Sequence, residues 1–275
     1  MNSSMFRFKN RDVLIEAHET PWDTKVLGFP AGRITKFHGR DIAGTKIAFK
    51  ALFSWASLNG IDFLSCRLNS FQLHESFALE SGGFRFVETL LHPYFDVDDG
   101  RGTVNGEIEI QEAGNHEVSF FSDMAAKSFT FERFHADFRV SDYAANQRYA
   151  NWITNSREND KLKLYKVQLY GGEIIGFFLV SYGEFRIANW ELTAIFPEFQ
   201  GRGYGRLTWN SFIALHRQEG MARITTSITA RNSKVLSLYS SLGFRFSTPE
   251  TTFHWVGVPP VEQKIELLLP GRSNP

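Results

Sequence analysis

The stretch ELTAIFPEFQGRGYGR, residues 191–206, indicates the fold of this chain. The apolar run 192–196 is typical of a buried strand, Pro197 ends it, and the glycines that follow lead into a helix expected to begin near Arg206. Glycines leave the backbone unobstructed, so several main-chain N–H groups can point at one pyrophosphate beside the positive end of the helix dipole. The stretch therefore predicts an anion-binding loop between a strand and a helix.

The spacing of Gly201, Gly203 and Gly205 argues against the two commonest phosphate loops. No Gly-Lys-Ser/Thr follows them, as a P-loop requires, and they do not form the G-x-G-x-x-G pattern of dinucleotide-binding proteins. A nucleoside triphosphatase and a dinucleotide dehydrogenase are therefore disfavoured. An ordinary glycine-rich turn stays open as the alternative interpretation of the loop alone.

The composition describes a globular chain without a strong field of one charge. Of 275 residues 43% are apolar, including 27 phenylalanines and six tryptophans, which is ample for one large core or two ordinary ones. Lysine plus arginine and aspartate plus glutamate both number 30. This balance gives no global attraction to nucleic acid or to an anionic membrane, and neither is expected as a partner.

The chain contains a single cysteine, Cys66, in the strand-like run 61–66. It allows no internal disulfide and is expected to be a small buried side chain, and no metal site is expected. The N-terminal residues lack an apolar run of signal-peptide length, and no stretch is long enough to span a membrane. A cytoplasmic location is the expectation.

The pattern of apolar residues, glycines and prolines predicts alternating strands and helices. In the first third of the chain it predicts strands at 13–18, 33–37, 61–68 and 84–91, helices at 45–58 and 74–79, and a turn-like segment at 20–30. After an aspartate- and glycine-rich stretch it predicts strands at 107–111, 164–169, 173–180, 192–196, 224–228 and from 244, two helices flanking a loop at 135–140, and a helix at 233–242.

Two parts of the chain repeat each other at an offset of 160 positions. The sequence Gly-Phe-Arg-Phe occurs at 83–86 and at 243–246, and Gly60 and Gly220 end comparable predicted helices. Self-similarity of this length indicates a duplicated folding unit.

The two copies differ where chemistry would lie. The glycine loop 200–205 falls opposite 40–45, which has one glycine and an acid, and Tyr239 falls opposite Leu79. We therefore expect only the second copy to bind a cofactor and to be catalytic.

The loop 200–205 matches the Q/R-x-x-G-x-G/A signature of the GNAT acyltransferases and resembles the loop that holds the pyrophosphate of acetyl-CoA. Two more stretches, HETPWDTKVLGFPAGRITKF at 18–37 and FERFHADFRVSDYAANQRYANWI at 131–153, resemble the TDP-fucosamine acetyltransferase family. Members of that family acetylate the amino group of a nucleotide-linked 4-amino-4,6-dideoxy sugar.

The resemblance implies an α+β fold with a mixed sheet, namely a GNAT domain preceded by a truncated, degenerate GNAT-like half. The expected boundaries are 1–98 for the truncated half, 99–115 for a linker, 116–258 for the catalytic domain and 259–275 for a tail. It also implies an acetyl-CoA-dependent N-acetyltransferase for cell-surface polysaccharide synthesis, in which the acceptor amine attacks the acetyl group directly.

The resemblance further assigns roles to residues. Acetyl-CoA would be bound by the strand residues Leu192, Thr193, Ala194 and Ile195, by the loop residues Gln200, Gly201, Arg202, Gly203, Tyr204, Gly205 and Arg206, and by Asn232. Asn232 is equally placed to cap the next helix. Tyr239 would act as the general acid on the departing thiolate, and Glu191 as the base that accepts the amine proton.

The acceptor would be met by the loop that carries Arg133, His135, Asp137 and Arg139. These side chains could bind the sugar or its nucleotide phosphate, or could cap the flanking helices, and the sequence does not distinguish these roles.

Two other functions stay open from the sequence. One is a GNAT enzyme that acts on a different small-molecule or protein amine, and the other is a non-catalytic acyl-CoA-binding sensor. The sequence also leaves the oligomeric state open, with a homodimer as one option.

Overall fold

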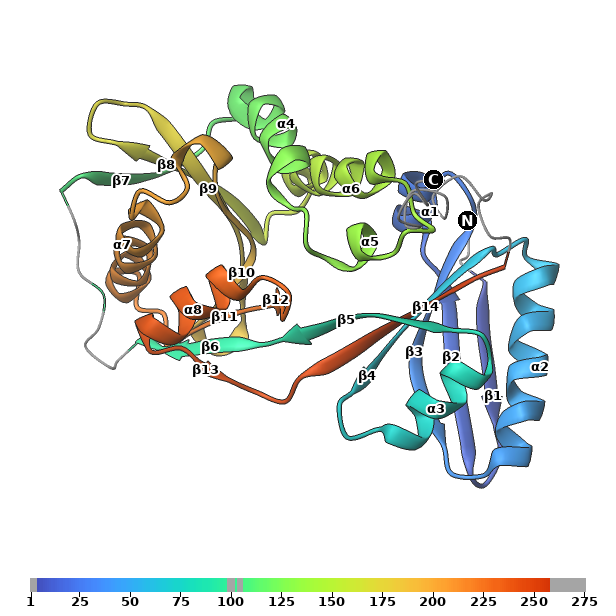
Figure 1. The fold of residues 1–275 in the computed structure, drawn as a ribbon. Helices are drawn as coiled ribbons and strands as arrows, with labels where there is room; N and C mark the ends of the chain where they lie inside the picture. The colour runs from blue at the N-terminus through green and yellow to red at the C-terminus, as the bar shows by residue number, and fades with distance from the viewer. Residues whose placement is uncertain (1–3, 98–101, 103–105, 258–275) are drawn as a thin grey trace, which may run out of the picture. The chain divides into compact units, whose positions relative to one another are not determined.

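The computed structural model describes residues 4–97, 102 and 106–257 and divides into two compact units (Figure 1). The first unit comprises the described residues up to Val87, Arg133–Ala145 and the described residues from Thr251. The second comprises Glu88–Glu132 and Asn146–Glu250. Each unit has its own sheet and its own buried clusters.

The first unit is built on a mixed sheet in the order β1-β2-β3-β4-β14-β5. Its strands are β1 (Met5–Lys9), β2 (Val13–Glu19), β3 (Ala31–Gly39), β4 (Phe63–Asn69), β14 (Glu250–Val256) and the start of β5 (Arg85–Leu91). Its helices are α1 (Pro21–Leu27), α2 (Ile42–Leu58), α3 (Leu73–Ser81) and α5 (Arg133–Ala136). β3 and β4 are parallel, and α2 buries Ala48, Phe49 and Leu52 in the core.

The second unit has a sheet in the order β13-β6-β11-β10-β9-β8-β7. Its strands are β13 (Arg245–Phe246), β6 (Pro93–Asp96), β11 (Arg223–Thr226), β10 (Ile187–Ile195), β9 (Ile174–Gly183), β8 (Leu162–Leu169) and β7 (Ile108–Glu112). Its helices are α4 (Val118–Ser128), most of α6 (Asp142–Asn155), α7 (Tyr204–Gln218) and α8 (Ser233–Leu242). The short β12 (Ile228–Thr229) pairs with the end of β5.

Helices cover both faces of this second sheet. One buried cluster joins Trp190 of β10 to Phe212 of α7 and Tyr239 of α8, and another joins Leu192 of β10 to Phe121 of α4 and Ile153 of α6. The sheet is thus a layer between α7 and α8 on one face and α4 and α6 on the other, and it is mixed because β10 pairs parallel with β11 and antiparallel with β9. The predicted fold class is confirmed.

The predicted repeat is confirmed in the order and spacing of the elements. β4 and β11 begin at Phe63 and Arg223, α3 and α8 at Leu73 and Ser233, and β5 and β13 at Arg85 and Arg245, so each pair is separated by 160 positions (223 − 63, 233 − 73 and 245 − 85). The glycines in the turns before these strands share the left-handed conformation, with φ of 64° and 73° at Gly60 and Gly220. Glycine suits these positions because other residues are strained there.

The two copies exchange their last strands. β6, from the first half of the sequence, lies between β11 and β13 in the second sheet, and β14, from the end of the second half, lies between β4 and β5 in the first sheet. The unit boundaries therefore differ from the predicted ones at 98 and 258, since β6 counts with the second unit and β14 with the first. The expected tail at 259–275 lies outside the described residues, as does part of the expected linker.

The turn-like interpretation of 20–30 is wrong, because this segment forms the helix α1. Pro21 occupies the first turn, where its missing N–H is not needed, and Gly28 ends the helix at φ 78°. Seven residues are too few to show a helical apolar period, which is why composition favoured a turn. Strand β1 was not predicted either.

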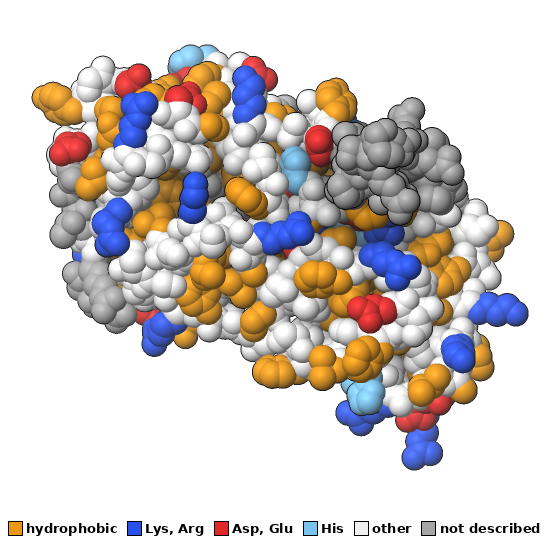
Figure 2. All heavy atoms as spheres, viewed as in Figure 1, with side chains coloured by type: hydrophobic (Ala, Val, Ile, Leu, Met, Phe, Trp, Pro, Cys, Tyr) orange, Lys and Arg blue, Asp and Glu red, His pale blue; other side chains and the backbone are white. Residues whose placement is uncertain are grey.

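The described residues bear on the predictions for the single cysteine, for membrane-spanning helices, for metal-binding side chains and for surface charge. Cys66 is buried, and its burial raises the pKa of the thiol. Within the described ranges no helix is long and apolar enough to cross a membrane, and no group of acidic, histidine or cysteine side chains could hold a metal ion. On the face shown in Figure 2 the described basic and acidic side chains are interspersed, in keeping with the zero net charge.

Candidate active site

The glycine loop joins the end of β10 to the start of α7. Pro197–Phe199 form a single 3-10 turn, and Gly201 and Gly203 then take left-handed backbone conformations with φ of 77° and 86°. A Cβ built on either glycine would meet no other atom within 4 Å. The loop is therefore open to a ligand and depends on glycine for its conformation.

The main chain of this loop has free hydrogen-bond donors. The N–H groups of residues 201–205 donate to no acceptor among the described residues, and the N-cap Gly203 has no side chain that could accept from them. Five such groups beside the positive end of a 15-residue helix are the chemistry that binds a phosphate or pyrophosphate.

The polar side chains of the loop are placed in three different ways. The side-chain amide of Gln200 donates to the Ile195 carbonyl at 2.8 Å, so Gln200 holds the loop against the strand. The exposed Arg202 lies over the Phe199 ring, 5.7 Å from its centroid. The exposed Arg206 donates to Ser241 Oγ at 2.9 Å. Arg202 belongs to the loop with the open N–H groups, and Arg206 directly follows it in the sequence. These positions suit contact of their guanidinium groups with a phosphate.

Strand β10 separates from its parallel neighbour β11 next to this loop. The two strands pair from Ile187–Arg223 to Trp190–Thr226 and no further, whereas β10 continues to pair with β9 as far as Ile195. Thr226 closes the last rung by donating from Oγ1 to the Trp190 carbonyl at 2.8 Å. Beyond this split, residues 192–195 have no partner strand on the β11 side within the described part of the chain, so this edge can pair with an extended ligand.

Tyr239 of α8 is fully buried beside the split. Its phenol faces Thr193 of β10, Thr226 of β11 and Trp209 of α7, but no described residue makes a hydrogen bond of normal geometry to it. Burial raises the pKa of the Tyr239 phenol, and these three neighbours offset only part of that effect. The phenol therefore keeps its proton at neutral pH, as a proton donor must.

Glu191 lies at a β-bulge in β10, one residue after Trp190, the last residue of this strand that pairs with β11. The register with β9 shifts between Trp190 and Leu192, which makes Glu191 the extra residue. Trp190 packs with α7 and α8 whereas Leu192 packs with α4 and α6, so the bulge reverses the alternation of faces. Glu191 thus points to the sheet face opposite Tyr239, and its carboxylate accepts a hydrogen bond from Ser181 Oγ at 2.6 Å.

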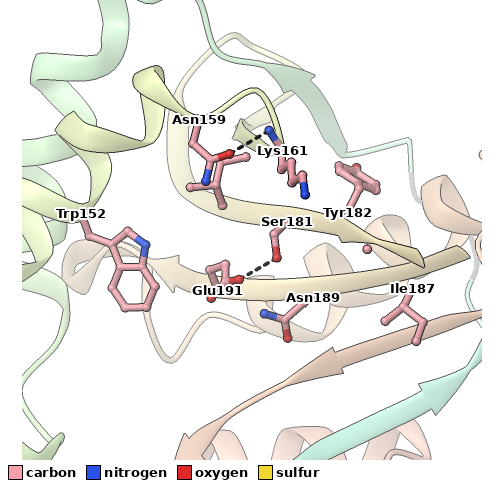
Figure 3. A pocket seen from close by; sticks show the side chains of 10 residues that line it. Trp152, Asn159, Lys161, Ser181, Tyr182, Ile187, Asn189 and Glu191 are labelled. Atoms are coloured by element: carbon pink, nitrogen blue, oxygen red, sulfur yellow. Dashed lines mark hydrogen bonds between the residues drawn. The ribbon is translucent and has the colours of Figure 1, made fainter. Parts of the chain in front are cut away.

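A pocket of about 470 Å³ lies over this face of the sheet (Figure 3). Its lining comes from α6, the segment after it, and the strands β8, β9 and β10, and comprises Trp152, Asn159, Lys161, Leu162, Ser181, Tyr182, Gly183, Ile187, Asn189 and Glu191. Of these only Glu191 was predicted as a site residue. The signal in the sequence was the pair of polar residues 189 and 191 in a strand whose alternate residues are apolar.

Asn232 is the N-cap of α8, and its side-chain oxygen accepts from the Val235 N–H at 3.2 Å. The capping role is therefore present in the structure. A role in cofactor binding stays a prediction.

The corresponding places in the first unit are filled by polar side chains. Asp41 caps α2 and accepts from the N–H groups of Ala43 and Gly44, at 3.2 and 2.6 Å. Gln72, the N-cap of α3, donates to the Phe37 carbonyl at 3.1 Å, and Glu75 of α3 accepts from the Gly39 N–H at 3.2 Å. In the first unit, therefore, side chains of the protein itself form hydrogen bonds to the main chain at the start of α2 and at the end of β3. The corresponding main-chain groups of the second unit are open.

The four predicted acceptor-binding residues lie in the first unit, on α5 and just after it. Asp137 is buried and bonds to Arg139 Nε at 2.8 Å and to His254 Nδ1 at 2.9 Å. The Arg133 guanidinium is buried 3.7 Å from the Asp23 carboxylate, and His135 is half-buried. The structure thus engages Asp137 and Arg139 in an interior cluster, and the role of all four in binding an acceptor stays a prediction.

Opposing effects set the protonation of this cluster. Burial lowers the pKa of His254 to about 4, and the bond to Asp137 only partly opposes it. Burial alone would raise the pKa of Asp137, but hydrogen bonds from His254 and Arg139 outweigh it and lower that pKa. His254 Nε2 has no partner among the described residues, which also favours the neutral imidazole.

Comparisons with known proteins support the family and the fold. Residues 124–244 match the sequence profile of the Acetyltransferase (GNAT) family. The spore coat polysaccharide biosynthesis protein SpsD of Bacillus subtilis (strain 168) is 21% identical over 252 residues, which cover 87% of this chain and 81% of that protein.

Solved structures share the fold at lower identity. A GCN5-related N-acetyltransferase from Sphaerobacter thermophilus superposes with a TM-score of 0.64 at 11% identity, over 90% of this chain and 78% of that one. A tandem GNAT protein from the clavulanic acid biosynthesis pathway gives 0.58 at 14% identity, over 91% and 80%. Residues 124–244 therefore form an acetyltransferase domain of the GNAT family, and this domain makes the chain an N-acetyltransferase that uses an acyl-CoA donor. The solved structures add the shared fold.

Proposed function

We propose that the second unit transfers acetyl from acetyl-CoA to the amine of a nucleotide-linked amino-deoxy sugar, for the synthesis of a cell-surface polysaccharide. The observation that carries the transfer is the split between β10 and β11, which has open N–H donors at one end and a buried, protonated tyrosine beside it.

The residues around the split fit the parts of acetyl-CoA. The unpaired edge of Leu192, Thr193, Ala194 and Ile195 would hydrogen-bond the amide groups of the pantetheine arm, as an added strand does. The N–H groups of residues 201–205 would receive the pyrophosphate, with Arg202 and Arg206 able to add charge. Asn232, at the start of α8, would lie near the pantetheine. Acetyl-CoA supplies an acetyl group already activated as a thioester.

Tyr239 and Glu191 would handle the two protons of the transfer. As the amine nitrogen forms its bond to the acetyl carbon, Glu191 accepts the amine proton, directly or through water. When the carbon–sulfur bond breaks, Tyr239 donates its phenolic proton to the departing thiolate, and it regains a proton later. Their location on opposite faces of the sheet suits a donor that approaches from the α7 and α8 side and an acceptor from the other.

Two resemblances support an amino sugar as the acceptor. SpsD is named for the biosynthesis of a spore coat polysaccharide. The stretches 18–37 and 131–153 resemble enzymes that acetylate a nucleotide-linked amino sugar.

A thiol-release assay with acetyl-CoA and a panel of amines tests the proposal. We expect turnover with nucleotide-linked amino-deoxy sugars and much slower turnover with amino acids, peptides and polyamines of the same concentration. Preferred turnover of one of those other amines would favour a different GNAT acetyltransferase. Tight binding of acetyl-CoA without turnover of any amine would favour a sensor.

A further inference from the structure

A row of polar side chains crosses the second sheet on the face that bears Glu191. Ser181 of β9, Asn189 of β10 and Thr225 of β11 are direct neighbours in register. Farther along the strands, the same face is apolar and packs against α4 and α6. Polar side chains on a sheet face that is otherwise covered by apolar groups need polar partners, and here they border a pocket.

The hydrogen bonds within this row leave specific groups available to the pocket. Thr225 Oγ1 donates to Asn189 Oδ1 at 3.0 Å, so the Asn189 amide NH₂ is left as a donor. Ser181 Oγ donates to Glu191 Oε1, so the second carboxylate oxygen of Glu191 is left as an acceptor. A donor and an acceptor about two residues apart on one strand can bind a hydroxyl group and an amine of the same ligand.

The remaining walls of the pocket add an aromatic surface and a positive charge. Trp152 lies on one side of the pocket, and Lys161 lies across β9 from Glu191 (Figure 3). The Lys161 ammonium forms no ion pair with a described side chain, whereas Lys163, two residues along the chain, is paired with Glu112 at 3.3 Å. The cavity is in the size range of small-molecule sites.

We propose that this pocket is the acceptor site, and that it binds an amine carried on a hydroxyl-bearing ring with an anionic substituent. Glu191 binds the amine, Asn189 donates to a ring hydroxyl, Lys161 pairs with the anion, and Trp152 packs against the apolar face of the ring. The inference rests on the proposed acetyl transfer and specifies its acceptor.

Steady-state kinetics with three matched acceptors test the assignment. They are an amino-deoxyhexose 1-phosphate, the methyl glycoside of the same amino sugar, and cyclohexylamine. Asn189→Leu is expected to raise KM at least tenfold for both sugars and to leave KM for cyclohexylamine and for acetyl-CoA unchanged. Lys161→Met is expected to raise KM several-fold for the phosphate alone. Lys163→Met, the matched control outside the pocket, should change none of these values.

Equilibrium titration of the sugar phosphate into Tyr239→Phe provides a readout that needs no turnover. The dissociation constant should rise when Asn189→Leu or Lys161→Met is added to this variant. Sugars acetylated with unchanged KM in both pocket variants would overturn the inference and leave the proposed function intact. Failure of the wild type to acetylate these sugars and the nucleotide-linked amino-deoxy sugars of the thiol-release assay would contradict the proposed function itself.

Discussion

The two copies of the repeat differ most where a strand passes into the following helix. In the first unit, β3 runs almost directly into α2, and Asp41 occupies two N–H groups at the start of that helix. In the second unit, β10 ends earlier, a longer glycine loop follows, and the N–H groups of residues 201–205 stay open. The same order of elements thus has its N–H groups occupied in one copy and open in the other, which supports placing the proposed donor site in the second copy.

The largest expected effect concerns Tyr239, which falls opposite Leu79 of the first copy. Tyr239→Phe keeps the ring and removes the proton, so kcat should fall by roughly a hundredfold or more. Stability should not fall, because the phenol has no hydrogen-bond partner of normal geometry among the described residues. Steady-state kinetics and thermal unfolding of the purified variant check both parts. A near-normal kcat, with chemistry shown to be rate-limiting, would make Tyr239 a packing residue like Leu79.

Acid should destabilise the first unit through His254. Its folded pKa, about 4, lies below the ordinary value of 6.5, so the unfolded chain binds more protons between these pH values and stability falls as pH is lowered through them. The loss is at most roughly 3 kcal/mol at pH 4. Urea unfolding at pH 7, 5.5 and 4 measures it, and His254→Phe should flatten this dependence. An unchanged dependence in that variant would show that His254 is not its source.

Gly201→Asp copies the acid of the first unit into the glycine loop, because Gly201 falls opposite Asp41 in the repeat. Aspartate tolerates the left-handed backbone at φ 77° better than most residues, and its carboxylate should occupy the free N–H groups and repel the pyrophosphate. We expect KM for acetyl-CoA to rise at least tenfold while KM for the acceptor changes little. Gly201→Asn, which has the same shape without the charge, should have a smaller effect, and equal effects on both substrates would speak against the loop.

The smallest expected effect is that of opening the first copy. Asp41→Ala removes the cap of α2 and should cost about 1 kcal/mol of stability in urea unfolding. KM for acetyl-CoA should not change, because Gln72 and Glu75 still occupy the strand end. A changed KM in this variant would mean that the first copy takes part in donor binding.

The sequence predicts local features well and long-range pairing poorly. The position of the glycine-rich segment between a strand and a helix, and most strands and helices, follow from residues that are near each other in the chain, and the structure confirms them. The repeat follows from matching two segments 160 positions apart, and the order of the elements confirms it. The exchange of β6 and β14 depends on which distant strand each one pairs with, which no local pattern encodes. The proposed acceptor pocket could not be predicted for the same reason, because the alignment of Ser181, Asn189 and Thr225 depends on strand register.

The number of acetyl-CoA molecules bound per chain tests the central claim most directly. Isothermal titration calorimetry of the full chain should give one site in the wild type and one site of equal affinity in Asp41→Ala. Two sites per chain, or a single site that Asp41→Ala removes while Gly201→Asp leaves it intact, would contradict the assignment of donor binding to the second copy.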